Sequence, residues 1–321
     1  MSEARQQLIV GVADRFFSVL KQQRLVQASE RALDRAQTMS KASEARANVG
    51  LATQLDVLRA DLLVSQATVT LASQREGLAT ALEELNLLLG RPPAQPVDVA
   101  DEDVSDEGLV AMGFHLPGGD STETVEQLVA AALDSRADVR EAHDRIGDAE
   151  RNVNVSRWNL LPQVNLNASY TERGLGPSTM PELARLINGW RISLATSYAL
   201  DRSDQIAAAG SASVSLRAAQ RAAEDTGRRV ETDVRRAYRG WTRSGVTIDI
   251  QRKTVDLTDK QVRLAQLRFE RGLATSLDVV DAENNLYQAQ SALIEAERGR
   301  ALALLSLERA AGTLAPERFL Q

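Results

Sequence analysis

Two acidic residues, Asp278 and Asp281, have the spacing to act together. They are three residues apart and follow a Gly-Leu-Ala-Thr turn at 272–275, so on a helix they would share a face just beyond that turn. Such a pair concentrates negative charge at one point. The alternative is that each acid only stabilises the start of its helix, typically by about 0.3–1 kcal/mol. Asp56, after an earlier turn, would do so equally well, but Arg59 stands where Asp281 has its counterpart. For Asp281 both explanations remain open.

No group of residues in the sequence forms a catalytic constellation. The two histidines, His115 and His143, are far apart, and the chain has no cysteine. We expect a surface or packing role for both histidines, and neither enzyme activity, a cofactor nor a metal site. The net charge of −6 gives no reason to expect nucleic acid as a partner.

The turn that precedes the acidic pair occurs twice. Residues 272–282 read GLATSLDVVDA, and residues 50–60, placed 222 positions earlier, read GLATQLDVLRA. The same offset pairs Gly90 with Gly312 without a gap. A match of this length at a constant offset indicates an internal duplication.

Long helices are expected on both sides of each turn. Residues 1–91 and 182–315 contain none of the eight prolines, and a proline inside a helix costs roughly 3 kcal/mol. Leu55, Leu58 and Leu62 begin a loosely heptad stripe, which we interpret as the seam between the two arms of the first hairpin. The helices are expected at about 2–47, 54–89, 137–158, 203–269 and 276–311, with a short helix starting at an Asp-x-x-Glu pattern at 120–123.

Three segments follow from this pattern. Residues 1–90 form a first-repeat helical hairpin, and residues 91–136 form a proline-, glycine- and acid-rich linker with a short helix. Residues 137–321 form the second repeat, with a helix, a strand pair at about 161–200 and a helical hairpin at about 203–312.

The strand pair is predicted from strict alternation. Apolar and polar residues alternate over 161–170 and again over 192–200, as expected of strands with one wet and one apolar face. Each run has about the length of a tilted membrane strand. Aromatic residues near strand ends are typical of a lipid–water boundary, and four lie here: Trp158, Tyr170, Trp190 and Tyr198. The alternative is a soluble two-stranded hairpin that covers a helical core.

The pattern as a whole resembles the TolC-like outer-membrane efflux protein family. The resemblance rests on the duplicated turns at 50–60 and 272–282, on the Leu-Asp-Ser-Arg-Ala-Asp-Val segment at 133–139, and on the alternating strand at 161–170. Together these motifs span nearly the whole chain.

The resemblance implies a mainly α fold in which very long antiparallel helical hairpins build an α-barrel. One short pair of transmembrane strands per repeat would contribute to the β-barrel of a homotrimer. It further implies a passive export duct across the outer membrane and the periplasm, in a tripartite efflux pump or a type I secretion system. The partners would be a periplasmic adaptor protein, an inner-membrane transporter and outer-membrane lipid.

Site roles are implied in the same way. Asp278 and Asp281 match the acidic pair that lines the narrow aperture of family members, where carboxylate rings would select cations. The small, mostly apolar turns would contact the adaptor protein, through Gly50, Leu51, Ala52 and Thr53 and through Gly272, Leu273, Ala274 and Thr275.

Two departures from the family pattern stand out. A strand pair and a signal peptide would be expected before Ser2 and are absent, so we expect an N-terminally truncated family member or a mis-called start. Some members also hold the closed tip with an Arg and a Tyr near the second turn. Ala274 and Phe269 occupy the matching positions here, so that linkage is not expected.

Two other functions compete with the channel. A periplasmic adaptor also has a long helical hairpin, but only one, flanked by soluble β modules. A purely structural coiled-coil protein would leave the alternation between 161 and 200 without a purpose.

Overall fold

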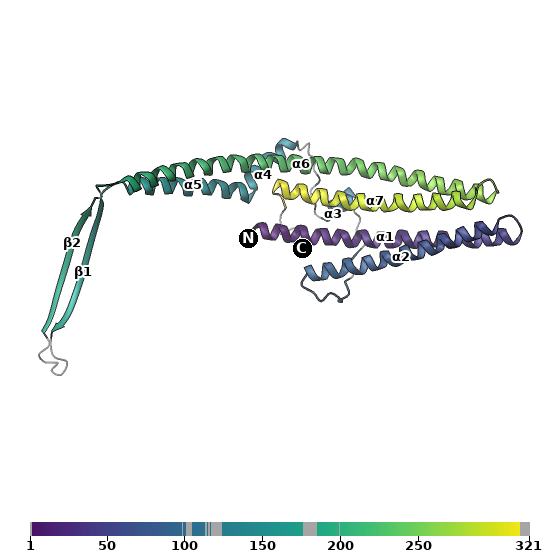
Figure 1. The fold of residues 1–321 in the computed structure, drawn as a ribbon, viewed down its shortest axis with the longest axis horizontal. Helices are drawn as coiled ribbons and strands as arrows, with labels where there is room; N and C mark the ends of the chain where they lie inside the picture. Colours follow the sequence, from purple (N-terminus) through teal and green to yellow (C-terminus); the bar gives the residue numbers. More distant parts are fainter. Residues whose placement is uncertain are drawn as a thin grey trace. The chain divides into compact units, whose positions relative to one another are not determined.

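The computed structural model describes residues 2–97, 99–100, 105–112, 114, 116, 124–175, 185–198 and 200–314. Its elements are α1 (Ser2–Asn48), α2 (Gln54–Leu88), α3 (Asp106–Ala111), α4 (Val125–Ser135), α5 (Ala137–Trp158), β1 (Gln163–Leu175), β2 (Arg185–Ser197), α6 (Ser203–Glu270) and α7 (Ser276–Ala311). The predicted fold class, mainly α with long antiparallel hairpins and one strand pair, is confirmed (Figure 1).

The chain forms two compact units. One comprises Met1–Ala137 together with Arg229–Gln321, and the other comprises Asp138–Arg228. These units cut across the predicted division by repeats, because the two helical hairpins pack on each other whatever their distance in sequence.

The first hairpin, α1 and α2, reverses direction through a Schellman motif. Gly50 takes a φ of 74°, which favours glycine, and the amides of Gly50 and Leu51 donate to the carbonyls of Ala47 and Arg46 at 3.0 and 2.8 Å. Thr53 then caps α2, as its sequence position predicts.

The second hairpin, α6 and α7, repeats this geometry. Gly272 takes a φ of 72°, and the amides of Gly272 and Leu273 donate to the carbonyls of Phe269 and Arg268 at 2.9 and 2.8 Å. The duplication in sequence is therefore a duplication in structure.

Near their turns the two hairpins share one apolar core. Ala36 and Met39 of α1 and Leu63 of α2 pack with Phe269 of α6 and Val279 of α7. Figure 1 shows the four helices side by side, with α7 and α1 in the middle and the part of α6 from Arg229 onward, together with α2, at the two edges.

The interpretation of Leu55, Leu58 and Leu62 as the seam of the first hairpin is wrong. All three are more than half exposed. The residues of α2 that are buried in this segment are instead Val57, Ala60 and Leu63. Heptad spacing identifies an apolar stripe, but it does not identify the neighbour that covers it.

The linker helix α3 is tied to the second hairpin by a charged contact. Arg300 of α7 donates from Nε and Nη2 to the two carboxylate oxygens of Asp106, at 2.5 and 2.6 Å. The same guanidinium lies 3.7 Å from the ring centroid of Trp241 on α6. One arginine therefore connects three helices.

The junction between α4 and α5 closes the end of α7. Ser135 and Arg136 donate to the carbonyls of Ala311 and Ala310, at 3.3 and 3.2 Å. These two residues lie in the Leu-Asp-Ser-Arg-Ala-Asp-Val segment, so that motif has a structural role. The capping box of α4 is formed by Thr124 and Gln127, not by the predicted Asp-x-x-Glu pattern. That pattern, at 120–123, lies outside the described residues, and so does His115.

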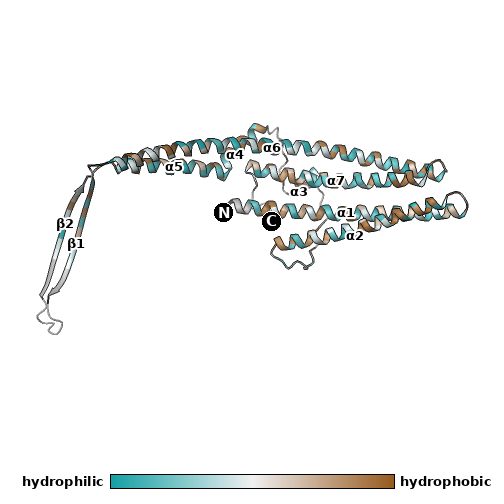
Figure 2. Cartoon of the chain, in the orientation of Figure 1, coloured by the Kyte–Doolittle hydropathy of each residue, from teal (hydrophilic) through white to brown (hydrophobic). Residues whose placement is uncertain are grey.

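The strand pair forms in the second unit and is longer than predicted. The strands β1 and β2 have 13 residues each and pair antiparallel, with Gln163 opposite Ser197 and Leu175 opposite Arg185. The predicted alternation is confirmed: Val164, Leu166, Ala168 and Tyr170 pair with Thr196, Leu194, Ile192 and Trp190 on one face. Figure 2 shows brown, apolar residues along both strands.

No helix among the described residues is long and apolar enough to cross a membrane.

Candidate functional site at the hairpin turns

Both turns are held by the same capping box. The amide and hydroxyl of Thr53 donate to Asp56 at 3.0 and 2.7 Å, and the Asp56 amide donates back to the Thr53 hydroxyl at 3.2 Å. Thr275 and Asp278 repeat these three bonds at 2.7, 2.8 and 3.4 Å. Each aspartate therefore satisfies helix N-terminal donors, whatever else it does.

The two capping aspartates differ in their second carboxylate oxygen. The Ser276 hydroxyl of the second turn donates to Asp56 Oδ1 at 2.6 Å and is itself fully buried. The hydrogen bond from Ser276, followed by the one from the Thr53 side chain, lowers the pKa of Asp56 from 3.8 to about 2. Asp56 thus belongs to the contact between the two hairpins.

Asp278 and Asp281 point to solvent at the second turn. The backbone and then the side-chain hydrogen bond from Thr275 lower the pKa of Asp278, with a smaller contribution from the charge of Arg268. Asp281 is exposed and makes no hydrogen bond or ion pair with any part of the chain that the structure describes. The structure thus gives Asp278 a structural role and leaves the Asp281 charge without one.

Arg46 joins the two turns and was not singled out by sequence reasoning. Its Nη1 donates to the carbonyl of Glu270 at 2.6 Å, at the end of α6, and its guanidinium lies 5.0 Å from the Phe269 ring centroid. A cation at a helix C-terminus is favourable because the terminal carbonyls carry partial negative charge. Its counterpart Arg268 is exposed, so the duplication alone could not identify which arginine makes the contact.

The expected tip residues are accessible. Leu51 and Leu273 are 68 % and 73 % exposed, and Gly50, Thr53, Gly272 and Thr275 are exposed as well. Ala52 and Ala274 are half-buried, and Ala274 packs against the shared core. Each turn therefore presents one exposed leucine at its end.

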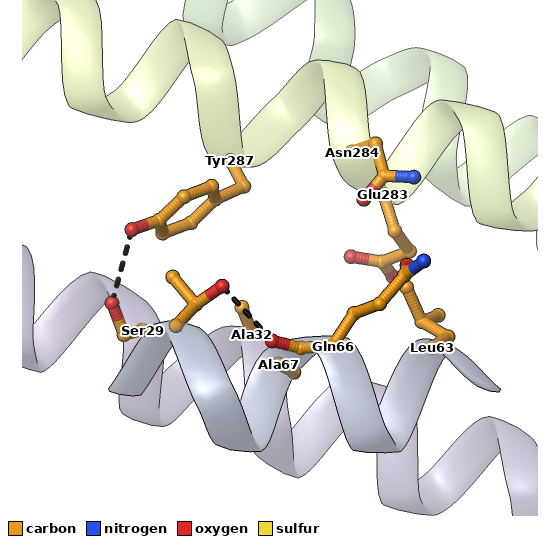
Figure 3. A pocket seen from close by; sticks show the side chains of 9 residues that line it. Ser29, Ala32, Leu63, Gln66, Ala67, Glu283, Asn284 and Tyr287 are labelled. Carbon is orange, nitrogen blue, oxygen red and sulfur yellow. Dashed lines mark hydrogen bonds between the residues drawn. The ribbon is translucent and has the colours of Figure 1, made fainter. Parts of the chain in front are cut away.

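A small cavity lies between the hairpins, away from the turns. It has a volume of about 50 Å³ and is lined by residues of α1, α2 and α7. Figure 3 shows Tyr287 of α7 reaching the hydroxyl of Ser29, 3.1 Å away, while Glu283 lies at the other end. A space of this size holds a few water molecules, so it is no binding site for a drug-sized ligand.

The four aromatic residues lie at two levels of the strand pair. Trp158 ends α5 and Tyr198 follows β2, both near the helical end. Tyr170 and Trp190 are opposite each other, with ring centroids 4.9 Å apart. This pair is in mid-strand, not at a strand end as expected, because both strands continue beyond it.

The described residues contain no group of acidic or histidine side chains that could hold a metal ion. The site is thus a pair of matching turns, with one carboxylate in the contact between hairpins and two at the surface.

This combination defines a two-repeat protein of long helical hairpins with one strand pair, the architecture of outer-membrane channel proteins. The outer membrane efflux protein family matches residues 1–91 and 128–313, and the chain belongs to that family. The predicted family and its outer-membrane localisation are confirmed, and the alternatives of an adaptor or a purely structural coiled coil are not supported.

Relatives and solved structures agree. The chain is 27 % identical over 313 residues to the solvent efflux pump outer membrane protein SrpC of Pseudomonas putida, covering 95 % of this chain and 62 % of that protein. It is 25 % identical over 318 residues to the pyoverdine export outer membrane protein OpmQ of Pseudomonas aeruginosa, covering 95 % and 61 %. The fold matches the outer membrane protein VceC of Vibrio cholerae with a TM-score of 0.76 at 20 % identity, covering 97 % and 71 %. The chain thus spans about three fifths of the length of these curated relatives.

Proposed function

We propose that the protein is the outer-membrane channel component of a tripartite efflux pump, a passive duct without catalytic activity. The relatives are named for the efflux of solvents and the export of pyoverdine, which favours this role over type I secretion. The observation that carries the proposal is the strand pair. Its apolar face is exposed, with Leu166, Ile192 and Leu194 each about 70 % accessible.

The dimensions of the strand pair suit a membrane. The alternating run from Leu161 to Tyr170 has ten residues, within the roughly 9–11 residues that a membrane strand tilted by about 45° needs. The apolar band of an outer-membrane barrel is about 25 Å tall and flanked by aromatic girdles. Trp158 and Tyr198 would then mark one boundary with water, and Tyr170 and Trp190 the other.

Two strands cannot satisfy their own edges in lipid, because every backbone group there needs a partner. The proposal therefore includes a homotrimer whose copies share one barrel. The long helices would extend into the periplasm, toward an adaptor protein and an inner-membrane transporter.

The most direct test of this role is complementation. The full-length protein should lower the accumulation of a fluorescent efflux dye in a strain that lacks its own outer-membrane channel but keeps the pump and adaptor. Its mass in detergent should be that of three chains. A stable, soluble monomer that leaves dye accumulation unchanged would contradict the proposal.

The adaptor contact can be tested at the turns. Leu51→Asp and Leu273→Asp place charges at exposed positions without strain, unlike substitutions of Gly50 and Gly272 with their positive φ. We expect both changes together to abolish export while the three-chain mass is kept. A matched control is Val110→Asp, at a similarly exposed position on α3. If the turn variants export normally, the adaptor binds elsewhere.

A further inference from the structure

One face of the strand pair is polar. The register of β1 and β2 fixes which side chains share a face, because successive residues of a strand alternate between the two sides and directly paired residues lie on the same side. The polar face is opposite the one that carries Leu166 and Leu194, and all its members are exposed. It consists of Gln163, Asn165, Asn167, Ser169 and Thr171 on β1 and of Gly189, Arg191, Ser193, Ala195 and Ser197 on β2.

Of these residues, Arg191 alone carries a charge. It makes no hydrogen bond, ion pair or ring contact with any residue that the structure describes. Arg202, at the helical end of the strand pair, differs in this respect. Its Nη1 donates to the carbonyl of Leu160 at 3.3 Å, and its guanidinium lies 5.2 Å from the ring centroid of Tyr198. Arg202 therefore holds the junction of strand and helix, whereas the charge of Arg191 has no such role.

The neighbours of Arg191 leave its charge open to water. Ser169 lies opposite, and Gly189 and Ser193 are next to it on the same face of β2. A Cβ added at Gly189 would meet nothing within 4 Å. These small neighbours do not cover the guanidinium, so its charge acts on the space in front of the polar face.

The membrane decides which side that space is on. Charged residues on the lipid side of an outer-membrane strand are destabilising, whereas residues on the inner side of the barrel tune its selectivity. The apolar face, with Ile192, suits lipid, so in the barrel proposed above the polar face lines the lumen. Arg191 follows Trp190 and is opposite Ser169. It therefore lies at the level of the Tyr170–Trp190 pair, away from the end of the strands that joins the helices.

We propose that Arg191 forms a ring of positive charge in the lumen of the barrel and attracts anions there. The inference rests on the homotrimer proposed above, in which three copies of Arg191 lie at one level. Rings of arginine or lysine are the usual means of favouring anions in pores. The ligands are small anions, including cargo that carries carboxylate, phosphate or sulfonate groups. The ring is opposite in sign to the carboxylates of Asp278 and Asp281.

Thiol reagents of opposite charge measure the potential at this ring, because the chain has no cysteine of its own. The reporter is Ser193→Cys, two residues from Arg191 on the same face and about 7 Å away along the strand. Full-length protein in detergent is treated with a methanethiosulfonate that carries either a sulfonate or a trimethylammonium group. The rate of modification by the anionic reagent, divided by the rate for the cationic one, reports the sign of the local potential.

Removal of the charge should lower this ratio. For one charge about 7 Å away in water, Arg191→Gln should reduce it about threefold at 0.1 M salt and about fivefold at 0.01 M. Arg191→Lys should keep the ratio, because it keeps the charge. The matched reporter is Ser197→Cys, six residues from Arg191 on the same face and about 20 Å away. Its ratio should be unchanged by Arg191→Gln at 0.1 M salt, where the screening length is about 10 Å.

Two measurements leave Arg191 in place and so do not depend on the assembly of Arg191→Gln. Raising the salt from 0.01 M to 1 M should lower the ratio at Ser193→Cys, because the screening length falls from about 30 to about 3 Å. The ratio at Ser197→Cys should change less. Ile192→Cys, on the apolar face, should react with neither reagent.

The outcomes separate the ring from the channel. A three-chain native mass with the same ratio at Ser193→Cys for Arg191 and Gln overturns the ring and keeps the channel. A ratio at Ser193→Cys that does not respond to salt also overturns it. Equal reactivity of Ile192→Cys and Ser193→Cys overturns the assignment of Arg191 to the lumen. A one-chain native mass for the unsubstituted protein overturns the channel together with the ring.

Discussion

The two hairpin turns share one local structure and differ in their surroundings. Both have a glycine at positive φ and a Thr-Asp capping box with nearly the same distances. Yet Asp56 accepts a hydrogen bond from Ser276 of the other hairpin, while Asp278 faces solvent. The shared motif therefore builds the turn, and residues outside the motif decide what the turn does.

The positions that break the repeat carry this difference. Ser276 has Gln54 as its counterpart, and Asp281 has Arg59. Ser276 donates a hydrogen bond to Asp56 of the other hairpin. Asp281 gives the second turn an extra negative charge where the first turn has the positive charge of Arg59. A few residues that differ between the repeats thus give two turns of the same structure different contacts and different charges.

Matched substitutions in the cores of the two hairpins should give the largest difference in the free energy of unfolding. Leu286 of α7 is 2 % exposed and packs with Val262 and Ala282, whereas its counterpart Val64 is only partly buried. Leu286→Ala should lower the free energy of unfolding by about 2–5 kcal/mol, because it leaves a cavity. Val64→Ala should cost about 1 kcal/mol. Urea unfolding in detergent measures both, and equal losses would show that the two hairpins are equivalently packed.

Substitutions of the glycines that follow α2 and α7 should give the next largest difference in stability. Gly90 and Gly312 both have positive φ, where alanine costs about 1–2 kcal/mol. At Gly312 an added Cβ would also lie 2.5 Å from Ser135 Oγ and 3.1 Å from Arg136 Cγ, but at Gly90 it meets open space. Gly312→Ala should therefore lower the unfolding midpoint clearly more than Gly90→Ala. A larger loss for Gly90→Ala than for Gly312→Ala would mean that Ser135 and Arg136 do not pack tightly against the end of α7.

The arginines before the turns should differ by a smaller amount. Arg46→Ala removes a hydrogen bond to Glu270 and the contact with the Phe269 ring, a loss of about 1–2 kcal/mol. Arg268→Ala removes an exposed side chain and should cost less. Thermal unfolding of the two variants checks this, and a larger loss for Arg268→Ala would contradict the asymmetry of the turns.

The capping aspartates should show the smallest effect, and it should depend on pH. The folded-state pKa of Asp56 is depressed to about 2, so its contribution is present above its usual pKa and is lost as the pH falls from about 4 toward 2. After a discount for solvent screening, Asp56→Ala should cost about 1 kcal/mol at pH 7. Asp278→Ala should cost less. A cost for Asp56→Ala that stays constant down to pH 2 would show that the carboxylate charge is not involved.

Most elements could be predicted from the sequence because their signals are local. Proline-free runs, the two Gly-Leu-Ala-Thr turns and the strict alternation at 161–170 depend only on backbone preferences and periodicity. The predicted ends of the five long helices lie within about two residues of those observed, which is the usual accuracy for helix boundaries. The short helix α4 begins at Val125, later than the predicted start at 120–123, and α3 was not predicted.

The contacts between elements could not be predicted in the same way. Leu55, Leu58 and Leu62 form a clear stripe, but the stripe alone does not say that α1 packs elsewhere on α2. The bond from Ser276 to Asp56 joins residues 220 positions apart. The strands extend past Tyr170 and begin before Ile192 because pairing, rather than alternation, keeps these residues extended.

The central proposal is that Asp278 and Asp281 line the narrow aperture of the channel. Single-channel recording tests it most directly. Asp278 and Asp281 from three copies would form two rings of carboxylates, which attract cations and repel anions. The reconstituted full-length protein should therefore be cation-selective. Because the hydrogen bonds from Thr275 lower the pKa of Asp278, the contribution of Asp278 should persist to a pH below the usual range of an aspartate. Asp278→Asn with Asp281→Asn should remove most of the selectivity at pH 7, while the matched control Asp56→Asn should keep it. An unchanged cation preference in the double variant would contradict the account, and the two acids would then only stabilise the start of α7.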